Sequence, residues 1–121
     1  RHFPETSVRL AHPLLGVGEA ELGLGHLARA RPLLERALSL FVRAESGPYQ
    51  LGAARFALAR ARFASGDRVA ALALLEQAAQ DLEQSGYEGA RELARLRAWQ
   101  QQRSGDPRQQ HQRHVGGDAD L

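Results

Sequence analysis

The sequence predicts an all-α protein, and three observations support this prediction. The 121-residue chain is rich in helix-favouring residues, with 21 Ala and 19 Leu, and poor in β-branched residues. Apolar residues recur at spacings of three and four along most of the chain, which is the period of an amphipathic helix. Turn-forming pairs such as Ser65-Gly66 interrupt this pattern repeatedly. We therefore expect about five helices and no strand in a single small domain.

Turn-forming residues give the limits of each expected helix. The first helix is expected to begin at Pro13, because the first turn of a helix needs no N–H there, and to end near Leu24 before Gly25. A good N-cap residue, Asp67, precedes the fourth helix. The other expected helices span 27–44, 49–64 and 87–103, and the fourth spans 68–84. The chain thus divides into a short N-terminal segment (1–11), a helical domain (12–103) and a flexible polar tail (104–121).

The two halves of the helical domain repeat each other. A shift of 41 positions aligns identical or similarly small residues of two helical hairpins, which span about 12–45 and 48–85. The aligned pairs are Gly18/Ala59, Gly25/Gly66, Ala30/Ala71 and Ala37/Ala78. Small residues within helices allow two helix axes to approach each other closely. We expect two stacked hairpins followed by one closing helix over 87–103.

This pattern resembles the tetratricopeptide repeat family. The hairpin of that family has a small residue in its first helix, a Gly in the turn and two Ala in its second helix, as the four aligned pairs have here. The period of 41 exceeds the usual ~34 residues and looks like the longer subtype, in which a His-Pro pair such as His12-Pro13 opens a unit. The aromatic residues often found in the first helix are missing from the first unit. The resemblance implies a short right-handed α-solenoid that binds peptides.

A narrower resemblance concerns the parent protein. The runs GARELARLRAWQ, FALARARFASGDRVAALALLEQA and RPLLERALSL are similar to the C-terminal repeat regions of bacterial, particularly myxobacterial, serine/threonine protein kinases. This resemblance implies a kinase domain upstream in the parent protein. The 121 residues themselves contain neither a Gly-rich nucleotide loop nor a His-Arg-Asp catalytic loop.

Composition excludes several kinds of catalytic and metal site. The chain has no Cys, which excludes a disulfide, a thiolate metal site and a cysteine nucleophile, and all 16 basic residues are Arg, which excludes a Schiff-base lysine. Of the histidines, His111 and His114 share a helical spacing, and both lie in the polar tail. Paired carboxylates such as Glu19 and Glu21 are two positions apart and point to different sides of a helix. We therefore predict a non-catalytic chain with no metal and no cofactor.

Charge and hydropathy argue against two classes of partner. The isoelectric point of about 9.9 overstates the basicity, because the net charge at pH 7 is only +2 and little titrates between His and Arg. The Arg residues alternate with acidic ones, as Arg36 follows Glu35, which indicates a mixed solvated surface. No apolar run is long enough to span a membrane. We predict no nucleic-acid partner, no membrane association and a cytoplasmic location.

The family resemblance also implies where a ligand would bind. In that family the first helices of successive hairpins line a concave groove. By position, the candidate groove residues are His12, Leu15, Glu19 and Leu22 of the first hairpin, and Ala53, Phe56, Arg60 and Phe63 of the second. Phe56, Arg60 and Phe63 share one helical face and could hold an apolar side chain beside a carboxylate. Two alternatives stay open, namely that a Phe packs in the core and that Arg60 is merely a solvated charge.

These observations favour a protein-interaction module over an enzyme. We expect a protein or peptide partner, and a role as scaffold or regulatory segment of a larger signalling protein. The alternative is a structural connector or oligomerisation segment that stacks on adjacent repeats. Helical arrays usually need about three repeats and polar caps, so open apolar ends predict either self-association or only marginal stability. Trp99 on the closing helix either covers such an end or anchors a partner.

Overall fold

Five α-helices form residues 3–104, the part of the chain that the computed structural model describes. They are α1 (Phe3–Gly23), α2 (Leu27–Arg43), α3 (Pro48–Ala64), α4 (Arg68–Gln84) and α5 (Ala90–Ser104), with a short 3₁₀ turn, η1 (Gly86–Gly89), before α5. No strand occurs among these residues, so the predicted all-α class is confirmed. The polar tail predicted for 104–121 lies outside the described residues, except for Ser104 at the end of α5.

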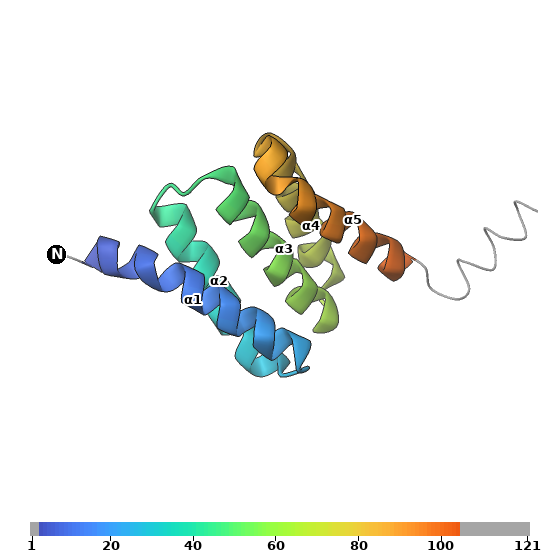
Figure 1. The fold of residues 1–121 in the computed structure, drawn as a ribbon. Helices are drawn as coiled ribbons and strands as arrows, with labels where there is room; N and C mark the ends of the chain where they lie inside the picture. Colours follow the sequence, from blue (N-terminus) through green and yellow to red (C-terminus); the bar gives the residue numbers. More distant parts are fainter. Residues whose placement is uncertain (1–2, 105–121) are drawn as a thin grey trace, which may run out of the picture.

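The helices form two antiparallel hairpins and one further helix (Figure 1). Helices α1 and α2 form the first hairpin, and α3 and α4 form the second, which packs on the first mainly through contacts between α2 and α3. Helix α5 packs on α4. As Figure 1 shows, α1 lies at one end of the array and α5 covers the other. This is the expected order of two stacked hairpins and a closing helix.

Helix α1 begins at Phe3, so the prediction that the first helix begins at Pro13 is wrong. Pro13 lies inside α1, where it lacks the N–H that would bond to the carbonyl one turn earlier. The fixed φ of proline is nevertheless helical, and Ala11 is fully buried in a cluster with Leu40 and Ala54. This packing against α2 and α3 offsets the missing hydrogen bond. From Phe3 onward, the predicted N-terminal segment 1–11 therefore belongs to the first helix.

The turns recur with the same period as the sequence repeat. Gly25 and Gly66, 41 positions apart, follow α1 and α3 with positive φ angles of 82° and 93°. Glu45 and Gly86, also 41 positions apart, follow α2 and α4 with φ angles of 55° and 63°. Glycine adopts such left-handed angles without steric cost, which is why it stands at three of these four positions. The sequence repeat is thus also a repeat of backbone conformation.

Alanine and leucine fill most of the core. The small residues predicted to pack between helices are all buried: Gly18, Ala30, Ala37, Ala59, Ala71 and Ala78. The largest fully buried side chains are Phe41, Phe56, Leu34, Leu82 and Leu96. No polar or charged residue is buried in the described part of the chain. Groups that can carry out chemistry or binding therefore lie on the surface of the array.

Helices α1 and α2 approach each other closely at Gly18. A Cβ atom built on Gly18 would lie 2.5 Å from Cδ2 and 2.8 Å from Cγ of Leu34, which is fully buried. Gly52 has the same role in the second hairpin, where a Cβ would lie 2.7 Å from Cγ of Leu82. Since real Cβ atoms do not approach other atoms so closely, a larger residue at either position forces the facing leucine side chain or the helix to shift.

We expect Gly18→Val to lower the free energy of unfolding by about 2 kcal/mol, because the added atoms overpack the contact with Leu34. The matched control is Gly16→Val on the same helix, where an added Cβ meets no atom within 4 Å. This control should change the unfolding free energy by less than about 0.5 kcal/mol. Urea denaturation followed by circular dichroism measures both values. Equal effects of the two substitutions would contradict the packing role of Gly18.

Candidate peptide-binding groove

A groove lies over α3, between α1 and α5, and consists of two hollows. The first, of about 310 Å³, is lined by His12, Leu15 and Glu19 of α1, by Tyr49, Gln50 and Ala53 of α3, and by Glu92 and Arg95 of α5. The second, of about 260 Å³, is lined by Glu19 and Leu22 of α1, by Arg60 and Phe63 of α3, and by Trp99 and Arg103 of α5. All the predicted groove residues except Phe56 line one of these hollows, so the structure brings them together.

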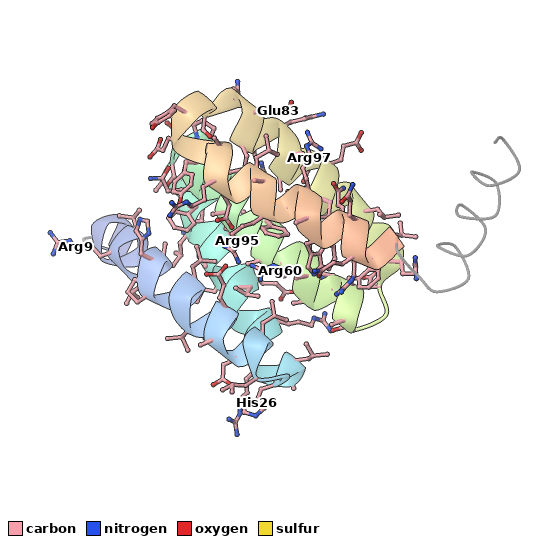
Figure 2. The ribbon with its side chains drawn as sticks, turned by 45° about the vertical axis from the view of Figure 1, so that its right-hand side comes forward. Arg9, His26, Arg60, Glu83, Arg95 and Arg97 are labelled. Atoms are coloured by element: carbon pink, nitrogen blue, oxygen red, sulfur yellow. The ribbon has the colours of Figure 1, made fainter. Side chains whose placement is uncertain are left out.

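An ion pair separates the two hollows. Glu19 accepts a hydrogen bond from Nη2 of Arg60 through its Oε2 atom, at a distance of 2.8 Å, and this pair joins α1 to α3. Glu19 lines both hollows, and Arg60 lines the second. In Figure 2 the labelled Arg60 and Arg95 lie between α1 and α5. The ion pair is therefore the centre of the groove floor.

Arg60 is held by its surroundings. Its side chain is only 17% exposed, and its guanidinium lies 4.4 Å from the centre of the Phe56 ring. Burial lowers the pKa of Arg60 below its usual value, while the charge and hydrogen bond of Glu19 act in the opposite direction. The Nε atom is buried without a hydrogen-bond partner. Neither alternative from the sequence describes Arg60, because it is neither a solvated charge nor a free anchor for a partner's carboxylate.

The two phenylalanines predicted to flank Arg60 differ in burial. Phe56 is only 1% exposed and belongs to the core, so it offers no surface to a ligand and is not a groove residue. Phe63 is partly exposed and lines the second hollow. Trp99 makes edge contacts with both rings, at centroid distances of 6.2 Å to Phe56 and 5.3 Å to Phe63. Trp99 thus combines the two roles left open, since it packs on the core cluster and also lines the groove.

Sequence reasoning missed the contribution of α5 to the groove. Glu92 accepts two hydrogen bonds from Nη1 of Arg95, at 2.9 Å and 3.0 Å, and both residues line the first hollow. The spacing of an acidic residue and an Arg three positions later is a signal for such a pair on one helix. The 41-residue repeat does not extend clearly into α5, so the sequence did not indicate which face of α5 meets the groove.

Comparison with known proteins identifies no relative. No family model, no curated protein and no solved structure matches the chain. The resemblance to tetratricopeptide repeats therefore rests on the residues of this chain alone.

Neither a metal site nor a membrane-spanning helix is found in the part of the chain that the structure describes. Within residues 3–104, no three His, Cys, Asp or Glu side chains are grouped so that they could hold a metal ion. None of the described helices has both the length and the apolar character needed to cross a membrane. The groove between α1 and α5 remains the feature of these residues that best suits a binding site.

The Glu19–Arg60 pair should stabilise the fold more than an exposed pair of the same chemistry. We expect a coupling energy of about 1–2 kcal/mol from a double-mutant cycle with Glu19→Ala and Arg60→Ala, because both side chains are shielded from water. The control is the cycle for Glu83 and Arg97, which lie 2.9 Å apart but are 56% and 53% exposed. That coupling should be below about 0.5 kcal/mol, and equal couplings in thermal or urea unfolding would contradict this assignment.

Proposed function

We propose that this chain is a non-catalytic protein-interaction module that binds a peptide segment of a protein partner in the groove between α1 and α5. It would serve as a cytoplasmic scaffold or regulatory segment of a larger signalling protein, in keeping with the kinase resemblance, and would need no cofactor. The observation that carries the proposal is the pair of adjoining hollows, to which three helices contribute both apolar and polar side chains.

The composition of the hollows suits a peptide. Leu15 in the first hollow and Leu22 and Phe63 in the second offer apolar surface for one side chain each. Gln50 and Glu92 at the first hollow offer an amide and a carboxylate for hydrogen bonds. Full burial of two large apolar side chains contributes about 3–6 kcal/mol before the entropic cost of binding. We therefore expect micromolar to millimolar dissociation constants, which suit a reversible regulatory contact.

Filling the first hollow with a larger side chain should weaken peptide binding there. A phage-displayed library of random peptides is selected on the wild-type protein, and the enriched peptides are then titrated against Ala53→Leu. Because Ala53 lines the first hollow, the larger side chain should weaken their binding by at least about tenfold. The matched control, Ala73→Leu, changes an exposed residue of α4 that lines neither hollow and should leave affinity unchanged. A library that yields no binders, or binders that are indifferent to Ala53→Leu, would overturn the proposal.

A second candidate function, self-association, is favoured by the surface of α1. Leu10 and Val17 of α1 are 39% and 51% exposed, and Leu24, directly after α1, is 69% exposed. The residues 41 positions after Leu10 and Val17 are Leu51 and Leu58 of α3, which pack in the clusters between α3 and α2. The exposed face of α1 is thus the counterpart of a face that is covered in the second hairpin. This correspondence supports the inference that another helix packs on the exposed face of α1.

We infer that the helix on α1 is α1 of a second copy of the chain. The three exposed residues are seven positions apart, so two antiparallel copies related by a two-fold axis at Val17 bring Leu10 of one copy next to Leu24 of the other. Pro13 and Ala20, which lie between them on the same face, are small and uncharged and permit close packing.

The dimer should dissociate when its centre is charged. Val17→Glu places two carboxylates at the two-fold axis, so we expect at least about a tenfold weaker dimer in light scattering over a series of protein concentrations. Val42→Glu is the matched control, because Val42 is 47% exposed and belongs to α2 instead of α1, and it should leave the dimer intact. A wild-type chain that is monomeric at every concentration, or a dimer unaffected by Val17→Glu, would contradict self-association through α1.

A further inference from the structure

A third hollow, of about 360 Å³, lies between α3, the first turns of α4 and the last turn of α5. Its apolar lining consists of Phe63, Leu72, Leu75 and Trp99, and its charged lining consists of Arg68 and Arg103. Leu72 is 60% exposed, so part of the apolar lining is open to solvent. The hollow shares Phe63, Trp99 and Arg103 with the second hollow of the groove, so the groove continues into it.

The two arginines of this hollow differ from the ion-paired arginines of α3. The guanidinium carbon of Arg68 lies 5.1 Å from the centre of the Phe63 ring, and that of Arg103 lies 5.2 Å from the centre of the Trp99 ring. Within the described part of the chain neither forms an ion pair, whereas Arg55, Arg60 and Arg62 all do. None of the described residues that line the hollow is acidic.

Asp67, the acidic residue nearest to Arg68 along the chain, already interacts with other groups. Asp67 accepts a hydrogen bond from the backbone N–H of Ala70 as the N-cap of α4, and it also pairs with Nη1 of Arg62 at 3.4 Å. The hollow therefore has an apolar, partly aromatic floor and two positive charges that have no carboxylate partner among residues 3–104. Carboxylates next to an apolar side chain would complement both properties, because guanidinium groups form strong charge-assisted hydrogen bonds with carboxylates.

We propose that this third hollow binds an acidic segment of the partner peptide, with a large apolar side chain on Phe63 and Trp99 and flanking Asp or Glu carboxylates on Arg68 and Arg103. This inference rests on the proposed function and adds to it the chemistry of the ligand. It differs from the carboxylate anchor that the sequence placed at Arg60, because Arg60 is already paired with Glu19.

Trp99, the only tryptophan of the chain, reports on this hollow through its fluorescence. The probes are two amidated, N-acetylated pentapeptides, Glu-Glu-Leu-Glu-Glu and Gln-Gln-Leu-Gln-Gln, which differ only in charge. We expect the acidic peptide to change Trp99 emission in a saturable way and the neutral peptide to bind at least about fivefold more weakly. Equal binding of both peptides, or no saturable change with either, would overturn the inference.

Charge-removing variants locate the effect. In Arg68→Gln/Arg103→Gln the acidic peptide should bind at least about fivefold more weakly than in the wild type. The control is Arg36→Gln/Arg91→Gln, which removes the same charge from two exposed arginines outside the hollow and should leave affinity within about twofold. Equal losses in both variants would mean general electrostatic attraction and would overturn the assignment of this site.

Two further outcomes separate this inference from the proposed function. If N-acetylglutamate alone binds as tightly as the acidic peptide, the hollow is a simple anion site and the peptide inference is wrong. If library peptides depend on Ala53 but show no enrichment of Asp or Glu, the groove function stands and the inference about the third hollow fails. If no library peptide binds at all, the proposed function is wrong, whatever the result with the acidic probe.

Discussion

The close approach of paired helices at small residues is the constraint on which the rest of this structure depends. Gly18 lies against Leu34 in the first hairpin, and Gly52 lies against Leu82 in the second. Because the axes are so close, alanine is large enough to fill most of the space between them. In each hairpin the first helix therefore forms one side of the array and the second helix forms the opposite side. Stacking the two hairpins and adding the closing helix places α1, α3 and α5 around one groove.

The second general feature is the use of arginine as the sole basic residue apart from histidine. A planar guanidinium can stack on an aromatic ring and bond a carboxylate at its edge, which an ammonium group cannot do in the same way. Arg60 does both, with Phe56 beneath it and Glu19 beside it. Arg68 stacks in the same manner on Phe63 but has no carboxylate in the described part of the chain. The presence or absence of a paired carboxylate thus distinguishes Arg60, which joins α1 to α3, from Arg68, which we propose binds a ligand.

Local signals in the sequence were sufficient for the helices and turns, but not for features that depend on distant contacts. Gly25 and Gly66 mark the hairpin turns because their backbone angles need glycine. The start of α1 before Pro13 is accompanied by the burial of Ala11 against α2 and α3, which no local pattern around Pro13 reveals. For the start of α1, tertiary packing therefore outweighs the local preference of proline for the first turn of a helix.

The same distinction applies to the groove. Positions on α1 and α3 could be predicted because the repeat relates the two helices, whereas α5 carries too little of the repeat to indicate its orientation. Phe56 and Phe63 share a helical face, and packing alone leaves one buried and the other accessible. The partner of Arg60 had a signal that sequence reasoning did not use, since Glu19 occupies the equivalent position 41 residues earlier with the opposite charge.

That charge reversal restricts which hairpins can be neighbours in the array. The first helices of neighbouring hairpins meet at the position of Glu19 and Arg60. Two copies of the first hairpin stacked in this way would bring two carboxylates together, and two copies of the second would bring two guanidinium groups together. A junction of two unlike hairpins, as observed here, joins opposite charges at this position. The hairpins, although alike in backbone, are thus not interchangeable, and an array cannot be lengthened by simple duplication of either one without a compensating change at this position.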